Sequence, residues 1–168
     1  MYSSPSSLSN PLPSSAVTSV VTQLCLHVAD GSATGAPALS SGMAKSVKDL
    51  VEAANAVVPR ISPAQAQELI EGGNAVVVDV RDAPEVEKSG KVAGAVHIPR
   101  GMLEFRADPE SPYYDQSFAR DKTVIVYCAV GGRAALSGQA LKEMGYGEVY
   151  NLGGFNDWAE AGGAIEAP

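Results

Sequence analysis

Two short, predominantly apolar runs, at 75–78 and 123–127, constrain the fold more than any other feature of the chain. Both are rich in β-branched valine and isoleucine, and neither alternates with polar residues. Such runs are typical of strands buried on both faces, which occur in parallel sheets covered by helices. The sequence therefore predicts a sheet whose interior strands include these two segments.

Helical patterns alternate with the strands. Apolar residues recur at helical spacing over 44–57. Ser62-Pro63 supplies an N-cap followed by proline at the first helical position, and Gln65 stands three residues after the cap, so a second helix is expected over 63–71. The remaining expected elements are strands at 95–98 and 148–150 and a helix at 134–144. This order predicts an α/β domain of three layers, with a central parallel β-sheet and helices on both faces.

Composition excludes several classes of protein. The chain has 168 residues, 45% hydrophobic and 18% charged, so disorder of the whole chain is not expected. Its 12 basic and 19 acidic side chains give a net charge of −7, which disfavours binding to nucleic acid or to an anionic membrane surface. No apolar run is long enough to span a membrane.

The first 42 residues differ from the rest of the chain. They hold 11 serines and four prolines but a single charged side chain, Asp30. A secretory signal would need a basic N-terminal region, and a transit peptide would be rich in arginine; this segment has neither feature. We expect residues 1–42 to be a disordered Ser/Pro-rich leader, which an upstream extension of the reading frame before Met43 would explain, and residues 43–168 to form the domain.

The turn after the strand at 123–127 has the pattern of an anion-binding site. Cys128 ends that strand, and residues 129–133 lead into the next helix. Gly131 and Gly132 allow conformations that point several N–H groups at one centre, and the helix start adds further N–H groups and a positive dipole end. Arg133 lies at the far lip of this cradle, and the same field favours the thiolate of Cys128. The alternative is that Cys128 is a small core residue.

Loop length distinguishes two chemistries. Cysteine phosphatases also place a cysteine and an arginine around a strand–loop–helix cradle, with five residues between them to encircle phosphate. Only four residues separate Cys128 from Arg133. The tighter ring suits a smaller anionic centre, such as the outer sulfur of a persulfide.

Three segments together resemble the rhodanese-like family of sulfurtransferases, single-domain type. VVVDVRDAPEVEKSGKVAGAVHIP at 76–99 resembles the first motif of the family, VIVYCAVGGRA at 124–134 resembles its active-site strand and loop, and YNLGGFNDWAEAGG at 150–163 resembles its closing motif. The resemblance covers roughly residues 60–165 and implies the rhodanese-like α/β fold.

The resemblance also implies a reaction. Cys128 would take the sulfane sulfur of thiosulfate or another donor as a persulfide, releasing sulfite, and would pass it to cyanide or a thiol acceptor. Backbone amides of the substrate-binding loop, Ala129, Val130, Gly131, Gly132 and Arg133, would stabilise the bound sulfur. Arg133 can also give paired donors to a sulfonate.

The expected partners are therefore a small-molecule sulfur donor and a thiol or cyanide acceptor, with a protein sulfur acceptor as a further candidate. No cofactor or metal is expected, since His27 and His97 are too few and too far apart for a metal site. Two cysteines do not form a disulfide scaffold, so we expect a free Cys128 thiol in the reducing cytoplasm. The alternative function is a rhodanese-like binding or regulatory module with incidental thiol reactivity.

Asp79 and Arg81 follow a strand end and are candidate residues of the cleft. We favour a structural ion pair instead, between Arg81 and either Asp79 or Glu85. His97 lies in an apolar strand, where a satisfied structural histidine is expected rather than a general base.

The remaining candidates have structural interpretations. Gly153-Gly154 is typical of a turn near the active-site end, and Phe155 and Trp158 are expected to pack a closing helix. The acidic side chains in the segment 82–87 are expected to form a solvated face.

Overall fold

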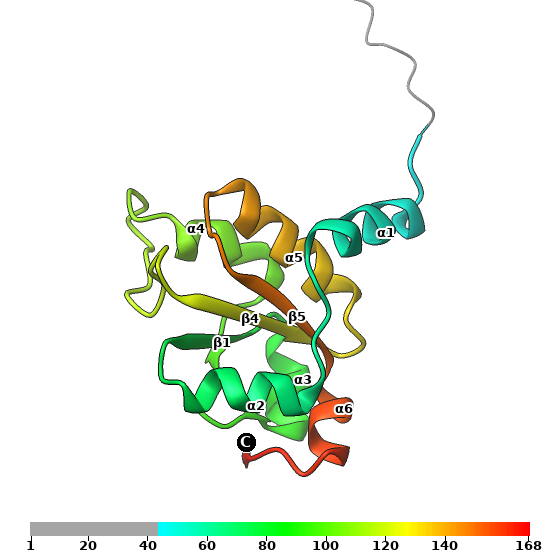
Figure 1. Ribbon diagram of the computed structural model, residues 1–168, viewed down its shortest axis with the longest axis vertical. Helices are drawn as coiled ribbons and strands as arrows, with labels where there is room; N and C mark the ends of the chain where they lie inside the picture. Colours follow the sequence, from blue (N-terminus) through cyan, green and yellow to red (C-terminus); the bar gives the residue numbers. More distant parts are fainter. Residues whose placement is uncertain (1–43) are drawn as a thin grey trace, which may run out of the picture. The chain divides into compact units, whose positions relative to one another are not determined.

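A computed structural model describes residues 44–168, and Figure 1 shows its helices and strands. The predictions about the leader concern residues 1–42, which lie outside the described part. The centre of the domain is a four-stranded sheet in the order β3-β1-β4-β5, in which every neighbouring pair is parallel. The strands are β1 (Ala75–Asp79), β3 (Val96–His97), β4 (Thr123–Cys128) and β5 (Val149–Gly154). The predicted parallel sheet is confirmed, with the two apolar runs as its interior strands.

Helices cover both faces of this sheet, as predicted. In Figure 1, α1, α4 and α5 lie on one side of the strands and α2, α3 and α6 on the other. The helices are α1 (Val47–Val57), α2 (Pro63–Glu71), α3 (Ala83–Ser89), α4 (Leu103–Ala107), α5 (Gly132–Glu143) and α6 (Phe155–Glu160), with a 3-10 turn η1 (Arg100–Met102) before α4. A small antiparallel pair, β2 (Lys91–Val92) and β6 (Ile165–Glu166), lies apart from the main sheet.

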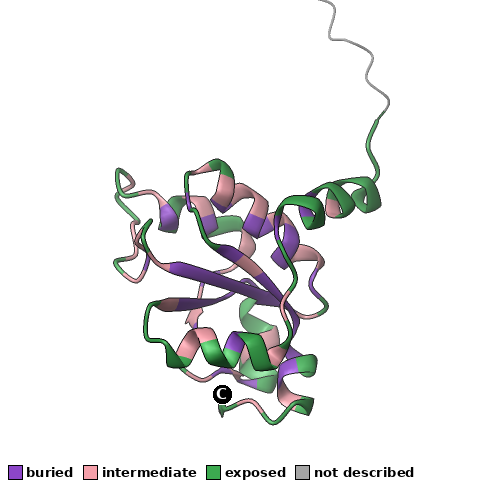
Figure 2. Ribbon diagram, viewed as in Figure 1, coloured by how far each residue is buried: buried purple, intermediate pink, exposed green. Residues whose placement is uncertain are grey.

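The strands divide their side chains between two hydrophobic cores, because successive residues of a strand point to opposite faces. Val124, Val126 and Cys128 belong to the core under α4 and α5. Ile125 and Tyr127 belong to the core under α2 and α6. Figure 2 shows β4 buried along its whole length. Double-sided burial explains why β4 is a continuous apolar run, and it also places the Cys128 side chain on the α5 face.

The helix starts follow their capping residues. Ser62 caps α2, its hydroxyl accepting from the Gln65 backbone N–H at 3.3 Å while the Gln65 side chain accepts from the Ser62 N–H at 2.9 Å. The predicted capping box is therefore confirmed. Ser46 caps α1 in the same way, so this helix begins at Val47 rather than at 44.

One prediction was wrong, and another holds only in part. Gly153 and Gly154 are the last residues of β5, not a turn, and the strand register shifts by one residue beside them. In the acidic segment, Asp82 and Glu87 are exposed as expected, but Glu85 is half-buried and pairs with Arg133 of the loop. No helix within residues 44–168 is long and apolar enough to cross a membrane.

Candidate functional site

Cys128 lies at the carboxyl end of β4, where the chain turns into α5. Its side chain is almost fully buried, and Sγ accepts a hydrogen bond from the Gly131 N–H with an N–S distance of 3.1 Å. The turn is short because α5 begins at Gly132, two residues earlier than predicted. The sulfur therefore faces a backbone donor and the start of a 12-residue helix, the arrangement that stabilises an anion.

Gly131 is needed for this turn on two grounds. Its φ of 98° is a left-handed conformation that residues with a side chain rarely adopt. A Cβ at this position would also lie 3.2 Å from the Cα of Gly153 in β5. The loop thus packs directly against the end of the neighbouring strand. Ala129 is half-buried, and the Val130 side chain is 79% exposed at the outer edge of the loop.

Asn151 of β5 holds the loop from behind, a role that the sequence analysis missed. Its side chain is buried, Nδ2 donates to the carbonyl oxygen of Gly131 at 3.2 Å, and Oδ1 accepts from the Gly153 N–H at 2.9 Å. The Gly131 N–H donates to Cys128, so the amide of Asn151 holds the same residue from the other side, through the peptide group that follows it. A polar residue in the middle of an otherwise buried strand was the available signal.

Arg133 pairs with two acidic residues: Glu85 in α3 and Asp82, the N-cap residue of that helix. Nη1 and Nη2 donate to the two carboxylate oxygens of Glu85 at 2.7 and 2.8 Å, and Nη1 lies 3.3 Å from Oδ2 of Asp82. The hydrogen bonds from Arg133 lower the pKa of Glu85 to about 2, and the Glu85 carboxylate in turn raises the pKa of Arg133. The lip of the loop is therefore fastened to α3 by a bidentate ion pair.

Asp79 and Arg81 form a separate, buried ion pair. Of the two partners expected for Arg81, Asp79 and Glu85, the ion-pair partner is therefore Asp79. The Arg81 Nη2 donates to Asp79 Oδ2 at 2.6 Å and to the Gly90 carbonyl at 2.6 Å. The Tyr127 hydroxyl also donates to Asp79 Oδ2 at 2.6 Å, and burial together with this carboxylate raises the tyrosine pKa. His97 Nε2 lies 2.9 Å from the Arg81 carbonyl oxygen, a hydrogen bond that fits the structural role expected for this residue.

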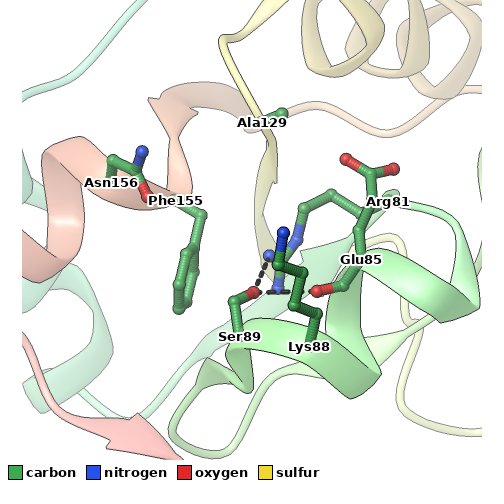
Figure 3. Close-up of a pocket in the computed structure, with 7 residues that line it drawn as sticks. All are labelled: Arg81, Glu85, Lys88, Ser89, Ala129, Phe155 and Asn156. Atoms are coloured by element: carbon green, nitrogen blue, oxygen red, sulfur yellow. Dashed lines mark hydrogen bonds between the residues drawn. The ribbon is translucent and has the colours of Figure 1, made fainter.

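An open pocket of about 440 Å³ lies beside the cysteine loop. Figure 3 shows Phe155 and Asn156 on one side and residues of α3 on the other, with Ala129 of the loop above them. Its lining residues are Arg81, Glu85, Lys88, Ser89, Ala129, Phe155 and Asn156. Arg81, but not Asp79, is thus part of the pocket wall. Lys88 and Asn156 were not predicted as site residues, because nothing in the sequence around them indicates that both line the same pocket.

Phe155 and Trp158 pack α6 as expected. Both are buried in the core under α2 and α6, and the Phe155 ring also carries the Arg81 guanidinium 4.2 Å from its centroid. Among residues 44–168, no group of histidine, cysteine, aspartate and glutamate side chains is arranged to hold a metal ion. The groups that this site brings together are a free thiol, a backbone N–H donor and the start of a helix.

Fold and site together define a class: an α/β domain in which a strand-end cysteine opens a six-residue, glycine-containing loop that leads into a helix. Residues 62–161 match the family model of the rhodanese-like domain, and the chain belongs to that family. The resemblance identified in the three motifs is thereby confirmed.

The chain is similar to several sulfurtransferases. It is 34% identical over 100 residues to thiosulfate sulfurtransferase GlpE of Coxiella burnetii, covering 59% of this chain and 85% of that protein. Over 103 residues it is 38% identical to the protein of the same name from Ectopseudomonas mendocina, covering 59% of this chain and 83% of that one. The family and these relatives support a sulfurtransferase class for this chain.

Two solved structures are also similar. The polysulfide-sulfur transferase homodimer of Wolinella succinogenes is 33% identical, with a TM-score of 0.60, covering 72% of this chain and 87% of that one. A Rhodopseudomonas palustris protein of unknown function, described as a possible tyrosine phosphatase, is 38% identical, with a TM-score of 0.68, covering 79% of this chain and all of that one.

Proposed function

We propose that this protein moves sulfane sulfur from thiosulfate or another donor to cyanide or a thiol acceptor through a persulfide on Cys128. The observation that carries the proposal is the hydrogen bond from the Gly131 N–H to Cys128 Sγ, at the start of α5. A cysteine that served only as a core residue would not need a backbone donor aimed at its sulfur. The reducing cytoplasm is the proposed location, because it keeps this thiol free.

The first half-reaction forms one sulfur–sulfur bond and breaks another. The Cys128 thiolate attacks the sulfane sulfur of thiosulfate, the bond between the two sulfur atoms of thiosulfate breaks, and sulfite leaves with the electron pair. In the second half-reaction the acceptor takes the outer sulfur, and Cys128 returns as the thiolate. The loop amides from Ala129 to Arg133 stabilise the negative sulfur in both states, as an oxyanion hole does for oxygen.

Arg133 is the proposed binding group for a donor sulfonate. Both of its Nη atoms donate to Glu85, so a sulfonate must share the guanidinium with that carboxylate. Its contribution is therefore expected at the lower end of the range for hydrogen bonds to charged groups, about 1.5 kcal/mol.

The phosphatase activity suggested for the similar Rhodopseudomonas palustris protein is less well supported by the loop of this chain. A phosphate ester needs a wider ring than the four residues between Cys128 and Arg133 provide.

Steady-state turnover tests the proposal. With thiosulfate and cyanide, the reduced protein should produce thiocyanate and sulfite in equal amounts, and Cys128→Ser should produce neither. Release of phosphate from an aryl phosphate ester at a comparable rate would favour the phosphatase reading instead.

A further inference from the structure

Of the two basic side chains that line the pocket beside the cysteine loop, one has no ion-pair partner within residues 44–168. Arg81 is paired with Asp79, and Glu85 is paired with Arg133. Lys88, on the last turn of α3, is exposed and makes no hydrogen bond or ion pair within residues 44–168. The pocket wall therefore combines two neutralised ion pairs with a free ammonium group.

The opposite wall offers an amide and the small part of the Phe155 side chain that is not buried. Asn156 is exposed, and its side chain likewise has no hydrogen-bond partner in the described part of the chain. Phe155 lies next to it, with its ring held against the Arg81 guanidinium. A ligand in this space would meet a positive charge, a neutral donor and acceptor, and apolar surface.

We propose that this pocket binds the thiol acceptor and selects an organic thiol that carries a carboxylate. Lys88 binds the carboxylate, Asn156 hydrogen-bonds to it or to a neighbouring polar group, and the carbon stem packs on Phe155. Ala129, the residue after Cys128, lines the pocket, so an acceptor bound there would lie beside the cysteine loop and would present its thiol to the outer sulfur of the persulfide. The pocket volume of about 440 Å³ is larger than thiosulfate needs, which favours an organic acceptor over this donor as its ligand.

The inference rests on the proposed sulfur transfer and concerns its second half-reaction. The acceptor thiolate attacks the outer sulfur of the protonated persulfide, a new sulfur–sulfur bond forms, and the bond to Cys128 Sγ breaks. The Cys128 thiolate leaves with the electron pair, and the product is the persulfide of the acceptor. No further oxidant or reductant is required.

Three small thiols of different charge provide the test: 3-mercaptopropionate, 2-mercaptoethanol and cysteamine. The full chain is first loaded with thiosulfate, freed of excess donor, and shown by mass to carry one additional sulfur. Its discharge by each thiol is then followed in single turnover. The intrinsic reactivity of each thiol differs, but it cancels when a variant is compared with the unaltered protein.

Two variants and a control make the comparison specific. In Lys88→Gln, discharge by 3-mercaptopropionate should slow about five- to tenfold, the effect of losing one hydrogen bond to a charged group at a partly exposed site. Discharge by 2-mercaptoethanol should change less than about twofold. Lys88→Glu should reverse the preference in favour of cysteamine. Lys142→Gln removes an equal charge from the far end of α5, about 14 Å along the helix from the loop, and should alter none of these ratios.

The outcomes separate this inference from the proposed function. If no persulfide forms, the proposed function itself fails. If it forms and the three thiols discharge it with ratios that Lys88→Gln and Lys88→Glu do not change, the acceptor pocket is wrong. If Lys88→Gln slows loading from thiosulfate and leaves discharge unchanged, Lys88 binds the donor, which also overturns the assignment.

Discussion

Replacing Asn151 with alanine should loosen the cysteine loop from behind. The buried amide of Asn151 bonds the Gly131 carbonyl at 3.2 Å and the Gly153 N–H at 2.9 Å. Removing the acceptor of a buried N–H costs about 1–3 kcal/mol, and losing the second bond costs about 1 kcal/mol. The variant should therefore be less stable by about 2–4 kcal/mol.

This loss of unfolding free energy can be measured as a fall in Tm. For a domain of about 125 residues, the entropy of unfolding makes each kcal/mol worth about 4 °C, so the Tm of Asn151→Ala should fall by about 8–15 °C. Gly131 should also hold its N–H less firmly on Cys128 Sγ. A loss of about 1 kcal/mol at this contact would slow persulfide formation from thiosulfate about fivefold at a temperature where both proteins are folded.

Asn55 provides the matched control. It is exposed on α1 and shares only a 3.5 Å contact with Asn151 Nδ2, so Asn55→Ala should lower the Tm by no more than about 2 °C. The reasoning fails if Asn151→Ala is no less stable than Asn55→Ala. It also fails if stability falls while the rate of persulfide formation stays the same, because Asn151 would then support the strand and not the loop.

Two further predictions concern the Arg133–Glu85 pair. Arg133→Ala should lower kcat/KM for thiosulfate about tenfold but affect an uncharged organic persulfide donor less, and an equal loss with both donors in steady-state assays would mean that Arg133 only holds the loop. Glu85 has a pKa of about 2 against an ordinary 4.5, so the stability that it contributes is present above pH 4.5 and is lost as the pH falls toward 2. Since both side chains are about one-third exposed, this contribution is about 1 kcal/mol at most. Urea denaturation should show the unaltered protein more stable than Glu85→Gln at pH 7 and the difference shrinking below pH 4.5; a difference independent of pH would contradict the ion pair.

The parts of the fold that were predictable from the sequence are those set by local patterns. Continuous apolar runs identified β1 and β4, because only double-sided burial permits them. The Ser62–Gln65 capping box fixed the start of α2. The cysteine loop was predictable because two glycines and a helix start follow a buried strand directly.

The start of α3 is also marked by a local pattern in the acidic segment 82–87. Asp82, Pro84 and Glu85 have the spacing of an N-cap, an early helical proline and a capping-box residue, and the Glu85 carboxylate does accept from the Asp82 N–H at 3.0 Å. That pattern predicts α3. Its pairing with Arg133 joins residues 48 positions apart and depends on which helix packs beside the loop, so it was not accessible from the pattern.

Other features of the site arise only when distant segments meet. Two adjacent glycines in β5 suggested a turn, but each is needed within the strand: Gly153 has a φ of 95°, and a Cβ at Gly154 would lie 2.7 Å from the carbonyl oxygen of Ala129. Asn151 reaches Gly131 across 20 residues, and the Lys88 pocket joins α3 to the start of α6. Side-chain contacts of this kind follow from tertiary packing and leave no periodic trace in the sequence.

The mass of the protein after a single exposure to thiosulfate tests the central claim most directly. The reduced chain should gain the mass of one sulfur atom, peptide mapping should place it on Cys128, and cyanide should remove it with release of one thiocyanate. Cys128→Ser should gain nothing under the same conditions. A stable mass gain in Cys128→Ser, or turnover by the unaltered protein without any sulfur bound to Cys128, would contradict transfer through this persulfide.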